Sequence, residues 1–213
     1  MAEWKLSIFD MDGTLLDSMP YWENVGRDYL QSKGIMVPED LKQSIETMTL
    51  RESAAYIKER FGFKEPVEIL LKDMLKNIIL AYQFLIPAKS GMKQVVKKEK
   101  EAGHPVIVLT SSDKDCAAAA LKRTGLYHFF DQIYTADELG MRKDSPEIFC
   151  ALCETYGVTT EETHCFEDAF YAVKAAKEAG CYVTAVYDPS MEEWWEEIKQ
   201  LSDEQIVPIY GRK

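Results

Sequence analysis

The most informative stretch of the sequence is Ile8-Phe9-Asp10-Met11-Asp12-Gly13-Thr14. It places two carboxylates one residue apart at the end of an apolar run, and a Gly-Thr turn follows at once. Two anions about 4 Å apart repel each other by roughly 4 kcal/mol at an effective dielectric constant near 20. A cation between the acids, or one acid kept protonated for chemistry, would explain the arrangement. An ordinary acidic turn is the alternative, so the segment needs support from elsewhere in the chain.

Apolar runs and helical patterns alternate through most of the chain. The run 106–109 (Val-Ile-Val-Leu) is continuously apolar and mostly β-branched, which is typical of a strand buried on both faces. Further strands are expected at 4–9, 132–135, 163–166 and 182–187, and helices at 92–102, 113–124, 146–156, 169–179 and 191–201. Strands separated by helices in this way indicate an α/β fold, with a Rossmann-like, doubly wound parallel sheet.

The stretch between the first and second predicted strands is different, because residues 17–83 have helical patterns throughout. Ser18 and Pro20 are helix-start signals, and apolar residues then recur at helical spacing up to Gly34. Three further helices are expected at 38–45, at 50–61 and from Pro66 onward. We therefore expect residues 1–16 and 84–213 to form the α/β core, with a helical domain of residues 17–83 inserted after the first strand.

Composition excludes several classes of protein. The net charge of −11, from 36 acids and 25 bases, argues against a nucleic-acid surface. The lysines on the helix predicted at 92–102 alternate with Glu99 and Glu101, which indicates a solvated helix face. No apolar stretch approaches eighteen residues, so no membrane span is expected. The start of the chain has no signal-peptide features and its five cysteines have no framework spacing, so a cytoplasmic protein is expected.

Two smaller patterns carry no function in this interpretation. Cys150 and Cys153 form a C-x-x-C within a helical pattern, for which we expect packing rather than metal or redox chemistry. The three histidines show no pairing that suggests a metal site. The sequence does not indicate an oligomeric state.

Polar side chains that could take part in catalysis or ligand binding follow several predicted strands. They are Asp10 and Asp12 after the first strand, Thr110, Ser111 and Ser112 after the second, Glu167 and Asp168 after the strand at 163–166, and Lys143 in a loop before a helix. Ligands of open parallel sheets bind at the carboxyl ends of the strands, so these side chains are expected to meet. Ser111 and Ser112 have a second explanation, since they could cap the helix that begins near Asp113.

Each of these residue types has a use in phosphoryl transfer. A carboxylate can attack phosphorus and hold the group covalently, and carboxylate oxygens suit Mg²⁺. A lysine and a hydroxyl can bind the oxygens of the transferring phosphoryl group. A second acid can protonate the leaving alcohol and then activate water, which is worth roughly 10²–10⁴-fold in rate.

Four segments resemble the motifs of the haloacid dehalogenase superfamily, and they occur in the expected order. They are Asp10-Met11-Asp12-Gly13-Thr14, Val108-Leu109-Thr110-Ser111-Ser112, Lys143-Asp144-Ser145-Pro146-Glu147-Ile148-Phe149 and Phe166-Glu167-Asp168-Ala169. The helical insertion resembles the small cap domain of the branch that contains sugar-phosphate phosphatases and β-phosphoglucomutase. The resemblance thus implies a core with an inserted helical cap.

The resemblance also implies roles for the site residues. Asp10 would be the nucleophile and Asp12 the general acid and base, while Thr110, Ser111 and Lys143 would bind the phosphoryl group. Mg²⁺ would be held by Asp10, the backbone carbonyl of Asp12 and Asp168, with Glu167 close by. The fourth motif departs from the family pattern, because Ala169 and Ala172 replace the usual Ser and Gly.

Two cap residues are nominated for substrate contact. Arg51 lies in a segment that resembles the phosphate-gripping cap loop of the mutases, although an arginine at the start of a helix is usually only solvated. Trp22 would line the substrate side of the cap or lie in its core.

The predicted function is that of a Mg²⁺-dependent phosphatase acting on a small phosphorylated metabolite, such as a sugar phosphate, through an aspartyl-phosphate. A phosphosugar mutase stays open, although Trp22 follows Tyr21 where those mutases carry a histidine. The third hypothesis is a non-catalytic binding module that keeps the fold. Dehalogenases lack the second acid, and phosphonatases need a cap lysine that is absent between Ile45 and Ile57.

Overall fold

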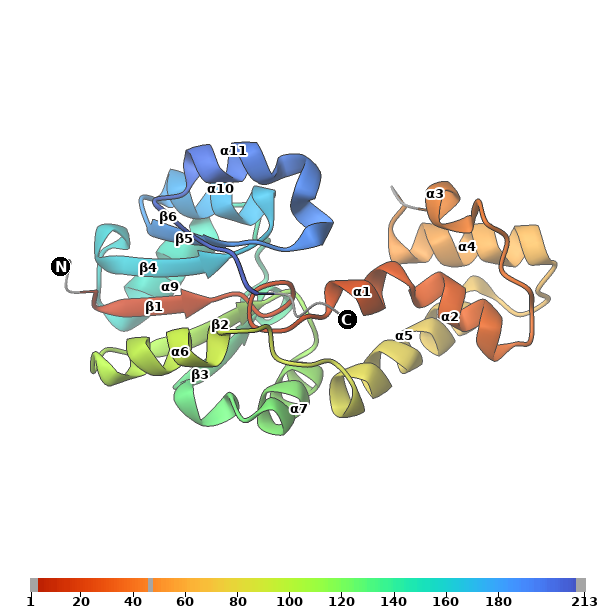
Figure 1. Ribbon diagram of the computed structural model, residues 1–213, viewed down its shortest axis with the longest axis horizontal. Helices are drawn as coiled ribbons and strands as arrows, with labels where there is room; N and C mark the ends of the chain where they lie inside the picture. Colours follow the sequence, from red (N-terminus) through yellow and green to blue (C-terminus); the bar gives the residue numbers. More distant parts are fainter. Residues whose placement is uncertain (1–3, 46–47, 210–213) are drawn as a thin grey trace. The chain divides into compact units, whose positions relative to one another are not determined.

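The computed structural model describes residues 4–45 and 48–209 and contains two compact units (Figure 1). One unit comprises Met1–Asp17 and Pro87–Lys213, and the other is Ser18–Ile86. The expected insertion, 17–83, is shorter at its carboxyl end than the second unit, because α5 (Val67–Phe84) continues past residue 83. Leu85 caps this helix, with its backbone N–H donating to the Ala81 carbonyl.

The first unit is built on a six-stranded sheet in the order β3-β2-β1-β4-β5-β6, with every pairing parallel. Its strands are β1 (Leu6–Phe9), β2 (Val106–Thr110), β3 (Gln132–Thr135), β4 (Thr163–Glu167), β5 (Tyr182–Val186) and β6 (Glu204–Ile206). This confirms the Rossmann-like α/β fold. In register, Phe9 of β1 lies opposite Val108 of β2 and Phe166 of β4. The carboxyl ends of these three central strands are therefore side by side.

Helices cover both faces of this sheet (Figure 1). They are α6 (Met92–Glu101), α7 (Lys114–Thr124), α8 (Ala136–Leu139), α9 (Glu147–Tyr156), α10 (Phe170–Ala179) and α11 (Trp195–Leu201), with 3-10 turns at Tyr127–Phe129, Thr160–Glu162 and Pro189–Trp194. One core cluster joins Ile8 of β1 and Leu109 of β2 to Phe149 of α9, Val173 of α10 and Ile198 of α11. Cys153 of α9 packs in this cluster, and all five cysteines are free.

Several local predictions for this unit were wrong. The helix expected at 191–201 starts only at Trp195, because Met191 leaves helical geometry (φ −108°, ψ 17°) inside a preceding 3-10 turn. The elements β6 and α8 were not predicted, because their three and four residues are too few to show a periodic pattern. Glu99 does not lie on a solvated face, because only 8% of it is exposed.

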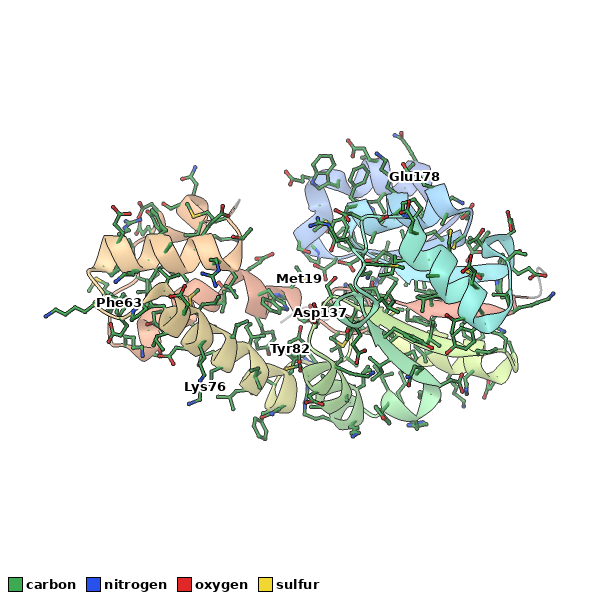
Figure 2. All side chains as sticks on the ribbon, turned by 180° about the vertical axis from the view of Figure 1, so that it is seen from behind. Met19, Phe63, Lys76, Tyr82, Asp137 and Glu178 are labelled. Carbon is green, nitrogen blue, oxygen red and sulfur yellow. The ribbon has the colours of Figure 1, made fainter. Side chains whose placement is uncertain are left out.

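The described residues of the second unit form helices and no strand, as expected. They are α1 (Met19–Glu23), α2 (Val25–Ser32), α3 (Leu41–Ile45), α4 (Leu50–Phe61) and α5. The single helix expected up to Gly34 is broken at Asn24, which marks the end of α1 and the start of α2. A helix starts where Ser18 and Pro20 predicted one, with Ser18 at the N-cap position of α1 and Pro20 in its first turn, although the Ser18 side chain makes no capping hydrogen bond with the described residues. On α5, Tyr82 is buried whereas Lys76 points into solvent (Figure 2).

Among the residues placed by the structure, no helix combines the length and apolar character needed to cross a membrane.

Candidate active site

Three carboxylates meet where β1 and β4 end. One oxygen each from Asp10, Glu167 and Asp168 lies within 4.8 Å of the other two. All three side chains are buried, with exposed fractions of 7%, 3% and 2%. The parallel pairing of β1 with β4 explains the arrangement, because Asp10 directly follows β1 while Glu167 ends β4. The structure therefore brings together the acids of the first and fourth predicted motifs.

Lys143 connects two of these acids from the loop between α8 and α9. Its Nζ donates hydrogen bonds to Asp10 Oδ1 and to Glu167 Oε2, each at 2.6 Å. Burial opposes the charged lysine, but the carboxylates of Asp10 and Glu167 outweigh it and raise the pKa of Lys143. The side chain is therefore a buried cation beside the predicted nucleophile.

One lysine does not balance three carboxylates. Burial, and then the charge of Asp10, raises the pKa of Glu167 to about 7 and holds the pKa of Asp168 well above its usual range. Asp10 Oδ2 is buried and has no hydrogen-bond partner among the residues that the structure describes. An excess of buried negative charge and an unsatisfied carboxylate oxygen both fit a divalent cation with a preference for oxygen ligands, such as Mg²⁺.

The Gly-Thr turn after Asp12 shapes this cluster. Gly13 has a φ of 89°, a left-handed conformation, and a Cβ there would overlap the Asp168 carboxylate. The next residue, Thr14, donates from Oγ1 to Asp168 Oδ1 at 2.9 Å. Glycine therefore gives Asp168 room, and the threonine hydroxyl orients it.

The loop after β2 supplies the hydroxyl groups. Ser112 donates from Oγ to Asp12 Oδ2 at 2.6 Å. Thr110 is fully buried, and its Oγ1 accepts from the Ser112 N–H at 3.0 Å, whereas Ser111 is exposed. Neither serine caps α7, because Asp113 accepts the hydrogen bonds from the first backbone N–H groups.

The Asp12 side chain is half-buried and does not belong to the cluster of three carboxylates. The resemblance assigned its backbone carbonyl, not its carboxylate, to the metal, and that contact stays a prediction.

The two nominated cap residues lie in the second unit. Arg51 donates from Nη1 to Glu68 Oε1 at 3.1 Å, with 61% of its side chain exposed. Trp22 donates from Nε1 to the Tyr82 hydroxyl at 2.9 Å. Their contact with a substrate remains a prediction.

A second buried lysine was missed by the sequence reading. Lys89 donates to the Gly13 carbonyl, to the Tyr187 carbonyl at 3.0 Å and to Asp188 Oδ2 at 2.6 Å. The side chains of Lys89 and Asp188 are 0% and 1% exposed. This contact fixes the turn next to the carboxylate cluster. Asp188 was the available signal, because it follows the strand predicted at 182–187.

The chain belongs to the haloacid dehalogenase-like hydrolase family, whose model matches residues 7–186. This confirms the resemblance seen in the four motifs. A phosphorylated carbohydrates phosphatase of Thermotoga maritima is 29% identical over 173 residues, which are 81% of this chain and 80% of that protein. A fructose-1-phosphate phosphatase of Escherichia coli is 29% identical over 178 residues, covering 81% of this chain and 91% of the relative.

The fold is shared with a β-phosphoglucomutase-like protein of Thermotoga maritima. The TM-score is 0.80 at 25% identity, and the match covers 95% of this chain and 94% of the other.

Proposed function

We propose that this chain is a Mg²⁺-dependent phosphatase that hydrolyses a small phosphorylated metabolite, such as a sugar phosphate, through an aspartyl-phosphate on Asp10. The observation that carries the proposal is the state of Asp10: Lys143 holds Oδ1, while Oδ2 is buried without a hydrogen-bond partner beside two further acids. The phosphatase relatives, one named for phosphorylated carbohydrates and one for fructose 1-phosphate, support the same reaction class.

Asp10, Glu167, Asp168 and the backbone carbonyl of Asp12 are the groups proposed to hold Mg²⁺. When bound, the ion neutralises negative charge on the phosphate and the carboxylates. Thr14 supports this role of Asp168, because its hydroxyl fixes one carboxylate oxygen and leaves the other for coordination.

Lys143 and the loop after β2 are proposed to bind the phosphoryl group. An ammonium group has three donors, and two of those on Lys143 point to Asp10 and Glu167, so one is left for a phosphoryl oxygen. Thr110 Oγ1 accepts from a backbone N–H, which leaves its own hydrogen to donate. Ser111 is exposed beside them.

In the proposed first step an oxygen of Asp10 forms a bond to phosphorus while the phosphorus–oxygen bond to the alcohol breaks. Asp12, as a carboxylic acid, gives its proton to the departing oxygen, and the hydrogen bond from Ser112 orients it. In the second step water attacks the aspartyl-phosphate, and the Asp12 carboxylate takes the proton of that water. Phosphate leaves, and Asp10 and Asp12 return to their starting states.

The second unit is proposed to act as a cap that excludes water during these steps, with Trp22 and Arg51 as candidate contacts to the substrate.

Five free cysteines, four of them buried, support the reducing cytoplasm as the compartment we propose.

The main test is release of inorganic phosphate from p-nitrophenyl phosphate and from a panel of sugar phosphates, with Mg²⁺ and with EDTA. We expect turnover with Mg²⁺ only, and its loss in Asp10→Asn, which keeps the shape of the side chain. Asp40→Asn, in an exposed ion pair of the second unit, is the control. Substantial turnover by a folded Asp10→Asn protein would contradict the proposal.

The role of Asp12 has its own test. Asp12→Asn should lower the turnover of an alkyl phosphate by roughly 10²–10⁴-fold. It should affect p-nitrophenyl phosphate much less, because nitrophenolate leaves without a proton. Equal losses on both esters would show that Asp12 is not the general acid.

A mutase is the second candidate, supported by the β-phosphoglucomutase-like neighbour. In this chain Trp22, whose indole cannot carry protons as an imidazole does, stands where the mutases have a histidine. The phosphatase is therefore better supported. An isomerised sugar phosphate, in place of free phosphate, would decide for the mutase.

A further inference from the structure

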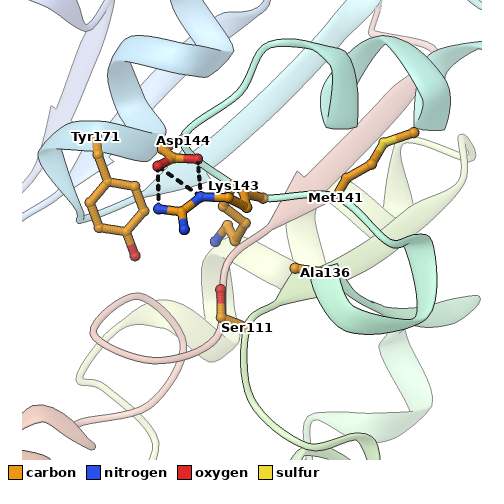
Figure 3. A pocket seen from close by; sticks show the side chains of 7 residues that line it. Ser111, Ala136, Met141, Lys143, Asp144 and Tyr171 are labelled. Carbon is orange, nitrogen blue, oxygen red and sulfur yellow. Dashed lines mark hydrogen bonds and ion pairs between the residues drawn. The ribbon is translucent and has the colours of Figure 1, made fainter. Parts of the chain in front are cut away.

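A cavity of about 400 Å³ opens beside Lys143 within the first unit (Figure 3). Its lining residues are Ser111, Ala136, Met141, Arg142, Lys143, Asp144 and Tyr171. The volume lies in the range of small-molecule sites, roughly 300–1,000 Å³. Lys143 is shared with the catalytic cluster, because its Nζ contacts Asp10 and Glu167. A molecule whose phosphoryl group is bound at Lys143 can therefore extend into this cavity.

The charge of Arg142 is already balanced within the cavity. Arg142 Nε lies 3.0 Å and 3.1 Å from the two oxygens of Asp144, and Nη2 lies 2.6 Å from Oδ2 (dashed in Figure 3). No described residue accepts a hydrogen bond from Nη1, which can therefore donate to a ligand. The Arg142 side chain is 83% exposed, and Asp144 adds an acceptor at the cavity wall.

Tyr171 and Ser111 provide hydroxyl groups from two other elements, α10 and the loop after β2. Tyr171 is half exposed, and Figure 3 shows both side chains at the same opening. Burial, and then the nearby Glu167 carboxylate, raises the pKa of Tyr171 to about 12, so its hydroxyl can donate at neutral pH. Met141 and Ala136 add apolar wall. Besides the guanidinium of Arg142, the cavity thus offers two neutral hydroxyl donors, the Asp144 carboxylate as an acceptor and an aromatic ring.

We propose that this cavity is a subsite for the non-reacting part of the substrate, and that it selects a neutral polyhydroxylated group over a second anionic group. The assignment rests on the proposed function, which places the phosphoryl group at Lys143. Hydroxyls can donate to Asp144 and accept from Arg142, Tyr171 and Ser111 at the same time. A second phosphate or carboxylate would instead add negative charge beside the Asp144 carboxylate, which already neutralises Arg142, and near the buried carboxylates of Asp10 and Glu167.

The first experiment measures the ratio of kcat/KM for a hexitol 6-phosphate to that for p-nitrophenyl phosphate, which lacks hydroxyls beyond the ester. Arg142→Ala and Tyr171→Ala should each lower this ratio about tenfold, the loss expected for about 1.4 kcal/mol of hydrogen bonding. Tyr171→Phe, which keeps the ring and removes only the hydroxyl, should lower it by a similar factor. Arg60→Ala removes a similar bidentate pair with Asp40 in the second unit and should leave the ratio unchanged.

The second experiment tests the choice between a hydroxyl group and an anion. Asp144→Asn releases Arg142 from its charge partner, so the preference for fructose 1,6-bisphosphate over the hexitol monophosphate should rise about tenfold. If the wild type already prefers the bisphosphate, the assignment to a neutral group is wrong.

A binding measurement separates this subsite from the proposed function. In the Asp10→Asn background, calorimetry with the hexitol 6-phosphate should show binding that Arg142→Ala weakens about tenfold. That result would support the subsite even if the wild type released no phosphate from any ester. No binding, or binding that neither Arg142→Ala nor Tyr171→Ala weakens, would overturn it even in an active phosphatase.

Discussion

The central strands of the sheet carry a buried polar cluster at each end, and the two clusters differ in how their charges are balanced. The carboxyl-end cluster consists of Asp10, Lys143, Glu167 and Asp168. The amino-end cluster consists of Ser7, Glu99, His104 and His164. Ser7 and Asp10 are three residues apart on one strand, or about 10 Å. The same strands therefore hold both clusters under similar burial.

At the amino end one carboxylate faces neutral or basic partners, and most of the polar groups are hydrogen-bonded; among the described residues only His164 Nδ1, 3.7 Å from Glu99 Oε2, is buried without a hydrogen-bond partner in this cluster. Ser7 donates from Oγ to Glu99 Oε2 at 2.7 Å, and His104 Nε2 lies 2.7 Å from the same hydroxyl. His164 Nε2 lies 2.7 Å from Thr184 Oγ1. Burial opposes the charge of Glu99, but the nearby His164 imidazole and the hydrogen bond from Ser7 hold the pKa of its carboxyl below the usual range. This cluster stabilises one charge and makes no metal-binding group of three ligands among the described residues.

The carboxyl-end cluster holds like charges together and leaves Asp10 Oδ2 unsatisfied. Such a site costs folding stability, and a bound cation and substrate recover it. The difference separates buried polar groups that hold the fold from those kept for chemistry. Removing a carboxylate should therefore stabilise the metal-free protein at the carboxyl end and destabilise it at the amino end, and only substitutions at the carboxyl end should lower activity.

The largest effect is expected for Asp10→Asn. Turnover should fall by roughly 10⁴-fold or more, as for removal of other catalytic nucleophiles. In EDTA the free energy of unfolding should rise, because one of three mutually repelling carboxylates is removed while Lys143 keeps Glu167 as its partner. Urea unfolding with EDTA and with Mg²⁺ measures both effects. A less stable metal-free variant would show that this end of the sheet is not under electrostatic strain.

Lys143→Met should lower stability by about 3–5 kcal/mol in EDTA, because it leaves two buried carboxylates without their cation. The double variant Lys143→Met/Glu167→Gln should recover part of this loss, since one of the orphaned charges is gone. Activity should not return, because Lys143 also binds the phosphoryl group in our proposal. Urea unfolding of the wild type, the two single variants and the double variant gives the coupling energy. Additive losses would contradict the ion-pair origin of the effect.

Glu99→Gln should lower stability by about 1–3 kcal/mol, the cost of disturbing a buried hydrogen-bond network. Its kcat/KM should match that of the wild type, because Glu99 lies at the opposite end of β1 from Asp10. Ser7→Ala is the partner variant and should lose a similar amount. A drop in kcat/KM at unchanged Mg²⁺ affinity would show that the two ends of the sheet are coupled.

The carboxyl-end cluster was largely predictable because its residues lie in recognisable positions. Asp10, Thr110 and Glu167 each stand at the end of an apolar run, and parallel strands place such ends at one edge. Lys143 was found through its motif rather than through a strand.

The residues that were missed depend on contacts across long stretches of sequence. Glu99 was assigned to a solvated face because its neighbours are lysines, whereas its partner Ser7 is 92 residues away. Lys89 has no local pattern, and its partner Asp188 is 99 residues away. Arg142 and Tyr171 flank matched motifs and Asp144 lies inside one, but only the folded chain places them around one cavity. Short elements such as β6 also escaped, since three residues carry no periodicity.

In metal-free protein the two clusters should also give the free energy of unfolding opposite dependences on pH, with a change of about 1.4 kcal/mol for each unit of pKa shift. At the carboxyl end the folded-state pKa of Glu167, about 7, is above its unfolded value. The stability it contributes is present in acid and is lost as pH rises through 7. At the amino end burial lowers the pKa of His104 below its usual value of 6.5. Its contribution is present above pH 6.5 and is lost as pH falls through the folded pKa.

Urea unfolding in EDTA between pH 5 and 8 separates these two contributions. In His104→Gln only the carboxyl-end acids contribute to the pH dependence of unfolding between pH 5 and 8. This variant should therefore gain more stability than the wild type as pH falls from 7.5 to 5.5. In the double variant Glu167→Gln/Asp168→Asn, which removes both carboxyl-end acids with raised pKa values, the contribution of His104 dominates, so that variant should lose stability over the same interval. Because Glu167 is proposed to bind Mg²⁺, saturating Mg²⁺ should remove most of the pH dependence of stability that comes from the carboxyl end. The pH dependence that comes from His104 should remain. Parallel pH profiles for the two variants would mean that buried charge is balanced in the same way at both ends of the sheet.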